Sequence, residues 1–352
     1  MTDDDKTIKS VDHAGSSYKM RINDSDRERW QEMQSYTDEL VSQGYQAIAG
    51  VDEAGRGPLA GPVVAAACIL PPDREFPGLN DSKKMTLKRR ETLYQNIIES
   101  AIAYSIIPVS AEIIDLINIR NATLQGMAAA VRNLKHEPDL VLTDAMALQG
   151  FTIPVQAIVK GDSKVNCIAA ASVLAKVSRD RLMGEYDISF PNYGFAQHKG
   201  YGTKAHYQAL EALGPCPIHR QSFLKTKLGE ACNARAGELG EKCEREVAHH
   251  LAKQGFAIIG HRFKIHNVGE IDLVCLRDDM VYFVEVKARS DSSNYGGLAA
   301  TITAEKIRHI RATAAIFLRD NKMSDKTAVL LAALVSLNNN QEVEHIKYLP
   351  IY

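Results

Sequence analysis

Short apolar runs that end in carboxylates stand out along the first half of the chain. Residues 47–51 are apolar and lead into the adjacent acids Asp52 and Glu53, and a second apolar run covers residues 63–70. Runs of this length, bounded by Gly and Pro, are typical of buried β-strands. The pattern therefore predicts two strands joined by a functional turn within residues 49–61.

The turn contains Gly55, Arg56 and Gly57 directly after the acid pair. Glycine lets the main chain approach a ligand closely, so the amides of this turn can bind a sugar or a phosphate. Two neighbouring carboxylates supply the oxygen ligands that Mg²⁺ and Mn²⁺ prefer. Because consecutive strand residues point to opposite faces, both acids can face one metal centre only if the strand ends or bulges there. The alternative is a strand followed by a solvated turn.

Two more acids come next in the same half. Asp144 closes the apolar run 139–145, so a strand would deliver its carboxylate at one end. Asp162 lies in a Gly-Asp-Ser turn that precedes a helix of small residues. The alternative for Asp144 is a structural turn residue, and the alternative for Asp162 is a helix N-cap.

The remaining pattern of the first half predicts the elements between these acids. Residues 1–25 are predicted to be a disordered polar tail, and helices are predicted over 26–42, 111–117 and 123–134. A further helix is capped by Asp81 or Ser82 and continues through 93–98. A strand is predicted over 101–109 and a loop over 192–203. The start of the capped helix is basic, with Lys83, Lys84, Lys88, Arg89 and Arg90. These side chains either contact phosphates, which we favour, or form a solvated face.

A second set of elements follows a polar linker at residues 229–235. The pattern predicts helices over 238–254 and 304–318, and strands over 256–263, 269–274, 281–287 and 329–337. Glu285 and Lys287 lie two apart on a strand and so point to one face, and Asp272 belongs to the neighbouring strand. Glu244 on the preceding helix is the fourth candidate, with Glu241 as its alternative. The carboxylates would bind a divalent metal, and the lysine would orient water or stabilise charge on a phosphate, as in phosphodiester hydrolysis. The alternative without a function is a surface strand of alternating charge.

Composition narrows the class of protein. With 352 residues, 45% of them hydrophobic and 24% charged, the chain is of an ordinary globular type with two expected domains. No apolar run approaches the ~20 residues that span a bilayer. The acidic N-terminus is unlike a secretory signal, and the 6 scattered cysteines indicate neither a zinc site nor disulfides. A cytoplasmic location fits.

The net charge of −1 is unevenly distributed. Residues 1–44 carry 6 basic and 10 acidic residues, residues 45–228 carry 20 and 17, and residues 229–352 carry 16 and 16. The middle segment is thus the basic one although it holds the candidate metal-binding acids. This small excess fits a nucleic-acid partner without requiring one.

Several motifs of residues 45–226 resemble those of the type 2 ribonuclease H family (ribonuclease HII), in the family's order. They are AGVDEAGRGPLAG at 49–61, Asp81-Ser82-Lys83, DLVLTDA at 139–145, the Gly-Asp-Ser turn at 161–163, and His-Lys-Gly-Tyr at 198–201. The resemblance implies an α/β fold with an RNase H-like mixed sheet and surrounding helices. It also implies cleavage of the RNA strand of RNA/DNA hybrids, including 5′ to single ribonucleotides in duplex DNA, as in ribonucleotide excision during DNA repair.

The same resemblance assigns roles to residues. Asp52, Glu53, Asp144 and Asp162 would be catalytic and would hold two divalent ions, Mn²⁺ or Mg²⁺, about 4 Å apart. Substrate contacts would come from the Gly55-Arg56-Gly57 loop at the 2′-hydroxyl, from Tyr201 on a neighbouring sugar, and from Ser82 and Lys83. The oligomeric state is left open.

Residues 235–350 resemble the YraN-like family, on the strength of GEID at 269–272 and FVEVK at 283–287. This resemblance implies a smaller, restriction-endonuclease-like α/β domain of the PD-(D/E)XK type. Cys243 stands where that family usually has glycine, which leaves the choice between Glu244 and Glu241 open. The domain would be either a DNA endonuclease or a non-catalytic docking module. The expected organisation is a tail and helix over 1–44, a ribonuclease domain over 45–228, the linker, and a nuclease-fold domain over 236–352.

Overall fold

The computed structural model describes residues 9–11, 17–228, 238–289, 303–338 and 341–351. The chain divides into two compact units. The first comprises residues 1–111 and 122–220, and the second comprises residues 112–121 and 221–352. None of the helices in these described ranges is long and apolar enough to cross a membrane.

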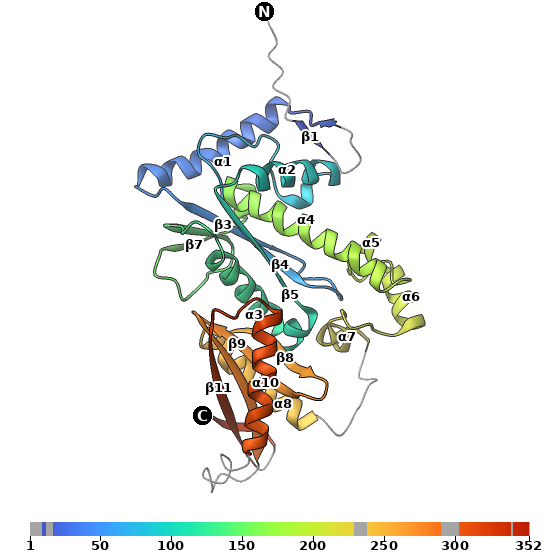
Figure 1. The fold of residues 1–352 in the computed structure, drawn as a ribbon. Coiled ribbons are helices and arrows are strands. Elements are labelled where there is room, and N and C mark those ends of the chain that lie inside the picture. Colours follow the sequence, from blue (N-terminus) through green and yellow to red (C-terminus); the bar gives the residue numbers. More distant parts are fainter. Residues whose placement is uncertain (1–8, 12–16, 229–237, 290–302, 339–340, 352) are drawn as a thin grey trace, which may run out of the picture. The chain divides into compact units, whose positions relative to one another are not determined.

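A mixed five-stranded sheet forms the centre of the first unit (Figure 1). Its order is β5-β4-β3-β6-β7, where β3 is Ile48–Ala54, β4 Val63–Ile69, β5 Ala103–Val109, β6 Leu140–Asp144 and β7 Val155–Ile158. Strand β4 is antiparallel to both neighbours, whereas β3, β6 and β7 are parallel. The central strands are buried along most of their length, which explains their continuous apolar runs. The predicted α/β class with a mixed sheet is confirmed.

The register of the sheet is regular at the acid pair. The ladder between β3 and β4 continues through Asp52, Glu53 and Ala54, so the strand does not bulge at the pair and ends only after it. Adjacent side chains in a regular strand alternate, and the two acids therefore diverge. Parallel pairing of β3 with β6 matches Val51 to Thr143, which brings the next residue of each strand, Asp52 and Asp144, side by side.

Helix α4 packs on the sheet and is the main buried helix of this unit (Figure 1). Its small residues Ala169, Ala170 and Ala171 are fully buried against β3 and β4. The approach is closest at Gly50, where an added Cβ would lie 2.1 Å from the carbonyl carbon of Cys167. The other helical elements of this unit are α1 Asp24–Ser42, η1 Ser82–Lys84, α2 Leu87–Ser100, η2 Gly161–Ser163, α5 Phe195–His198 and α6 Lys204–Leu213, with α4 itself at Asn166–Ser189.

Three predictions for this half need correction. The tail over 1–25 contains a short antiparallel pair, β1 Lys9–Val11 and β2 Ser17–Lys19, while residues 1–8 and 12–16 lie outside the described part. Asp81 caps only the short η1, and the following helix α2 has its own N-cap, Thr86. The expected loop over 192–203 contains α5, because Gly194 and Lys199 adopt left-handed conformations that bracket one helical turn.

The second unit has a five-stranded sheet of its own, in the order β12-β11-β10-β9-β8. Only β10 and β11 are parallel within it. Its elements are α7 Gln221–Leu228, α8 Glu238–Lys253, β8 Ala257–Ile265, β9 Gly269–Arg277, β10 Met280–Arg289, α10 Ala304–Asp320, β11 Thr327–Leu337 and β12 Val343–Pro350. The sequence pattern missed β12, in which half of the residues are exposed and none is buried. The linker predicted at 229–235 lies outside the described residues.

Helix α3, Ala111–Arg132, has residues in both units and bends at Asn118.

Candidate active site

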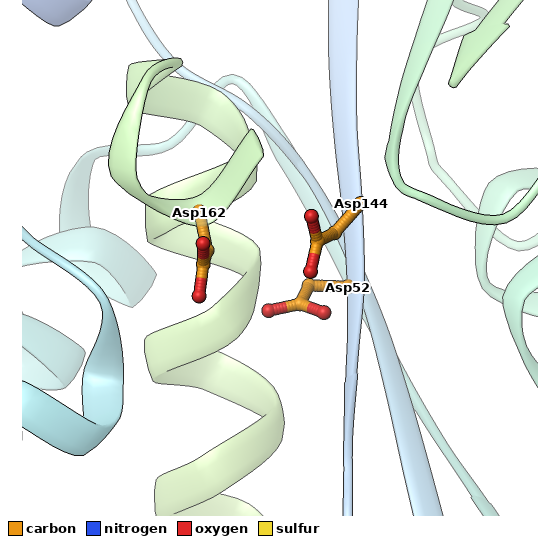
Figure 2. Close-up of side chains that lie close together, drawn as sticks. All are labelled: Asp52, Asp144 and Asp162. Atoms are coloured by element: carbon orange, nitrogen blue, oxygen red, sulfur yellow. The ribbon is translucent and has the colours of Figure 1, made fainter. Parts of the chain in front are cut away.

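Three carboxylates converge in the first unit. Oxygens of Asp52, Asp144 and Asp162 all lie within 4.8 Å of one another. Figure 2 shows the three side chains turned toward a common point, Asp52 and Asp144 from the strands and Asp162 from the turn before α4. The sheet explains the first pair, because two parallel neighbours present their carboxyl ends at one edge.

The 3₁₀ turn η2 brings in the third carboxylate. The Gly161 amide donates a hydrogen bond of 2.8 Å to Asp144 Oδ1, which ties this turn to the end of β6. Asp162 does not cap α4, because the N-cap residue of that helix is Val165 and no side chain caps it. The helix-capping alternative is therefore excluded, and the Asp162 side chain faces the other two acids (Figure 2).

The charges in this cluster repel one another. Burial raises the pKa of Asp52 well above its usual value, and the neighbouring Glu53, Asp144 and Asp162 carboxylates raise it further. Burial also raises the pKa of Asp162, with added repulsion from Asp81 and Asp144. Hard carboxylate oxygens crowded in a buried site are the donor set that suits a divalent cation such as Mg²⁺ or Mn²⁺. The residues present thus fit a metal.

Glu53 lies next to this cluster but is not one of its three members. Its Oε1 lies 3.4 Å from Arg56 Nη1, and its Oε2 is buried with no hydrogen-bond partner in the described residues. Burial raises the pKa of Glu53, and the nearby Asp144 contributes to the increase while Arg56 opposes it. The alternation of side chains along β3 accounts for its separation from Asp52.

One fully buried arginine, Arg220, holds the Gly-Arg-Gly loop, and a second, Arg179, holds the segments beside it. Arg220 donates from Nη2 to the Gly55 carbonyl at 2.6 Å and from Nη1 to the Arg56 carbonyl at 2.9 Å. Arg179 donates to the carbonyls of Ala60, Pro62 and Lys199. Gly55 has φ +97°, and a Cβ there would lie 2.0 Å from Arg179 Nε, so glycine is required. The Arg179 guanidinium thus binds main-chain carbonyls.

Tyr201 lies beside this loop. Its ring is the nearest group to the space over Gly57, at 3.9 Å from a Cβ built there, and the Arg179 guanidinium lies 6.0 Å from the ring centre. Tyr201 is 43% exposed and is therefore accessible to a ligand.

The Asp81-Ser82-Lys83 segment also approaches the carboxylate cluster. Lys83 is exposed, and its charge lowers the pKa of Asp162 against the effect of burial. Ser82 is buried, and its carbonyl accepts a hydrogen bond from Arg90. Arg89 pairs with Asp26. Arg89 and Arg90 make internal contacts, so they do not belong to the expected phosphate-binding face of this region.

A second group of polar residues lies in the second unit. Asp272 and Glu285 lie directly beyond Leu273 and Val284, the last pair of the antiparallel ladder between β9 and β10, and the Val286 amide donates to Asp272 Oδ2 at 2.7 Å. Lys287 Nζ lies 2.7 Å from Glu285 Oε1. Burial, and then the charge of Glu285, raise the pKa of Asp272 to about 6. Glu285 is 3% exposed, and its Oε2 has no hydrogen-bond partner among the described residues.

Two further residues define this second site. Lys306, in the first turn of α10, places its Nζ 3.1 Å from Glu285 Oε1. The sequence pattern did not single out this lysine, whose only local signal is its place three residues after the capping Thr303. Glu244 is buried, accepts hydrogen bonds from Arg262 and contributes to the raised pKa of Asp272. Glu241 instead is exposed and pairs with Arg245, so Glu244 is the nearer of the two alternatives.

Comparison with known proteins accounts for the first unit. Residues 49–226 match the family model described as Ribonuclease HII. The ribonuclease HII of Acetivibrio thermocellus is 50% identical over 221 residues, which cover 63% of this chain and 84% of that protein. The chain belongs to the ribonuclease HII family. The ribonuclease HII of Caldicellulosiruptor bescii is 52% identical over 191 residues, or 54% of this chain and 93% of that protein.

The ribonuclease HII match makes the chain an enzyme of the ribonuclease H type and confirms the first resemblance. Residues 243–334 match a second model, Uncharacterised protein family UPF0102, which confirms the YraN-like resemblance. Among solved structures, the ribonuclease H2 from Pyrococcus horikoshii OT3 is 25% identical with a TM-score of 0.44, covering 50% of this chain and 93% of that one.

Proposed function

We propose that this ribonuclease HII hydrolyses the RNA strand of RNA/DNA hybrids and cuts 5′ to single ribonucleotides embedded in duplex DNA. The observation that carries the proposal is the cluster of Asp52, Asp144 and Asp162 within 4.8 Å, beside a glycine-bracketed loop and an exposed tyrosine. Carboxylates that share a buried site bind divalent cations, and such cations stabilise charge on a phosphodiester during hydrolysis.

The cluster, with Glu53 at its edge, would hold Mg²⁺ or Mn²⁺, as a two-ion centre. When bound, the cations would supply Lewis-acid stabilisation of the phosphate and lower the pKa of a nucleophilic water. The chain's own residues select the substrate. The amides of Gly55-Arg56-Gly57, held by Arg220, face the 2′-hydroxyl, which distinguishes RNA from DNA. Tyr201 packs on a neighbouring sugar, and Lys83 neutralises a phosphate.

The test is nicking of a DNA duplex that contains one ribonucleotide. Asp52→Asn is expected to reduce metal-dependent nicking by at least about a thousandfold, because a carboxylate ligand is lost from the cluster. Asp73→Asn, at an exposed loop position, is the matched control and should cleave normally. A duplex with a 2′-O-methyl group at the same nucleotide should resist cleavage. Undiminished nicking by Asp52→Asn would remove the proposal.

For the second unit we propose a metal-dependent DNA endonuclease. The support is the position of Asp272 and Glu285 on two neighbouring strands, next to Lys287 and Lys306. The unpaired, buried Glu285 Oε2 is an orphan acceptor of the kind that a cation satisfies. The lysines would orient water and stabilise charge on the phosphate.

This second activity is tested in the full-length Asp52→Asn protein, in which ribonucleotide cleavage is absent. Metal-dependent cuts in DNA duplexes, flaps or four-way junctions are expected, and the additional change Glu285→Gln should abolish them. Glu344→Gln, at an exposed position of β12, serves as the control. If Glu285→Gln alters only the affinity for DNA and no cutting is seen with either protein, the unit is a docking module.

A further inference from the structure

Two buried histidines and a half-buried one lie directly behind the Tyr201 segment. His206 and His219 are fully buried, and their Nε2 atoms lie 3.0 Å apart. His198 stacks on His206 with ring centres 4.4 Å apart. The carbonyl of Tyr201 lies 3.0 Å from His206 Nδ1. This histidine cluster, defined as His198, His206 and His219, thus touches the main chain of the residue proposed to bind the sugar.

The hydrogen bonds fix one set of proton positions. A carbonyl oxygen only accepts, so His206 Nδ1–H donates to Tyr201 and, in a neutral ring, His206 Nε2 is an acceptor. His219 Nε2–H therefore donates to His206, which leaves His219 Nδ1 to accept from the Cys216 amide at 2.9 Å. Every bond in this series is satisfied when both rings are neutral.

Burial favours the neutral rings. Burial, and then the neighbouring His206, lower the pKa of His219 to about 4. Burial also lowers the pKa of His206, although its bond to the Tyr201 carbonyl opposes the change. The cluster is accordingly a fixed relay of hydrogen bonds at neutral pH.

The relay completes the anchoring of three successive carbonyls. Arg179 Nη1 donates to the Lys199 carbonyl at 3.0 Å, and the Leu59 amide donates to the Gly200 carbonyl at 2.8 Å. His206 donates to the third, that of Tyr201. The Gly200 amide donates to His198 Nδ1. The main chain of residues 199–201 is thus held by three different partners, whereas Tyr201 itself is 43% exposed and its ring lies beside Gly57.

We propose that His206 is a positioning residue for the ribonuclease reaction and that His219 orients it. His206 holds the main chain of Tyr201 in the position from which the tyrosine ring contacts the sugar. His206 touches no substrate and acts through the Tyr201 carbonyl. The inference rests on the proposed sugar contact of Tyr201. Loss of the His206 donor leaves the Tyr201 carbonyl with the Thr203 amide at 2.8 Å but without its side-chain donor, which weakens the anchoring of the segment.

Three variants of the full-length protein test the two hydrogen bonds of His206, to Tyr201 and to His219, one at a time. His206→Leu removes both hydrogen bonds, and the similarly shaped His206→Asn restores a donor at the Nδ1 position toward Tyr201. His206→Gln restores a partner for His219 but no donor for Tyr201. The measurements are kcat and KM on a DNA duplex with one ribonucleotide, and Tm.

His206→Leu and His206→Gln are expected to lower kcat/KM by about ten- to a hundredfold, since misplacement of a substrate-contacting group by about 1 Å has effects of that size. His206→Asn should recover most of the loss. In a Tyr201→Ala background, His206→Gln should have no further effect, because the two residues act in series. If His206→Leu does not fold, the Gln and Asn variants decide the question alone.

Three outcomes overturn the proposal, and they differ. If Tyr201→Ala lowers kcat/KM but the Gln and Asn variants of His206 cleave equally well, the positioning role is wrong and the Tyr201 contact stands. If Tyr201→Ala itself leaves kcat/KM unchanged, the proposed sugar contact fails and the positioning role fails with it. Equal losses for Gln and Asn, with lowered Tm in both, would show a purely structural role.

Discussion

At the residue scale, the carboxylate cluster works against the stability of the protein that contains it. Asp52 is buried, and its pKa is raised by burial and by three neighbouring acids. The unfolded chain loses this proton at a lower pH than the folded chain does. Between those two pKa values the folded state binds more protons, so stability falls as pH rises. At neutral pH the metal-free protein retains this repulsion.

Asp52→Asn should therefore stabilise the metal-free protein while it abolishes cleavage. We expect Tm to rise by roughly 2–4 °C, the shift that about 1 kcal/mol gives a domain of this size. Mn²⁺ should raise the Tm of the wild type and have a much smaller effect on the variant, because binding stabilises only the state that binds. Thermal unfolding with and without Mn²⁺ measures both. A variant less stable than the metal-free wild type would contradict the repulsion argument.

His219 predicts the opposite pH trend. Its pKa is about 4 in the folded protein and about 6.5 when unfolded, so the unfolded state binds more protons between these values. The stabilisation is complete above pH 6.5 and is lost as pH falls toward 4, by up to about 3 kcal/mol. Denaturant unfolding at pH 7 and pH 5 should show a smaller decrease for His219→Gln than for the wild type. Identical decreases would exclude this linkage.

At the scale of elements, the contact between β3 and α4 decides where the acids lie. Asp52 is on β3, and α4 follows directly after the turn that carries Asp162. The two elements approach closely only because Gly50 has no side chain, since a Cβ there would overlap the main chain of Cys167 at 2.1 Å. Main chain cannot move aside as a flexible side chain does.

Gly50→Ala should consequently force the helix away from the strand. We expect destabilisation of about 3 kcal/mol or more and a loss of metal-dependent cleavage, because the three carboxylates separate. Gly184→Ala is the matched control, since Gly184 lies in α4 with no atom within 4 Å of an added Cβ. That change should stabilise the protein by about 0.5–1 kcal/mol. Urea unfolding of both variants tests the pair, and similar effects at the two glycines would refute the argument.

At the scale of the whole molecule, two family matches occur in one chain. The match to the C. bescii ribonuclease HII covers 93% of that protein with only 54% of this chain. A relative of that length therefore lacks a counterpart for most of residues 229–352. The carboxylate cluster and the Gly-Arg-Gly loop lie in the first unit, and the group around Glu285 lies in the second.

Residues 1–228 alone are accordingly expected to cleave a duplex with one ribonucleotide with kcat/KM within about threefold of the full chain, because the carboxylate cluster lies wholly within the first unit and sites that share no partners have additive effects. Parallel kinetics on the two proteins provide the measurement. A loss of more than about tenfold, about 1.4 kcal/mol, would show that the second unit contributes to the ribonuclease reaction.

The sequence by itself determined the strand-forming runs and the acids that follow them, because apolar periodicity and turn residues are local properties. Asp52, Asp144, Asp272 and Glu285 could be marked in this way, and the mixed α/β class was correctly predicted. The spacing of the acids along the chain did not show which of their carboxylates lie close together in the folded protein. Asp162 joins Asp52 and Asp144, while Glu53, adjacent in sequence to Asp52, remains outside the three.

Only the tertiary structure decided these partnerships, since they depend on strand register and on packing between segments far apart in the chain. Pairing of Val51 with Thr143 sets Asp52 beside Asp144, and strand alternation turns Glu53 away. Arg179 and Arg220 are both buried and bind main-chain carbonyls, a role that no local sequence pattern indicates. A buried guanidinium needs several acceptors at once, and only the folded chain brings those carbonyls together.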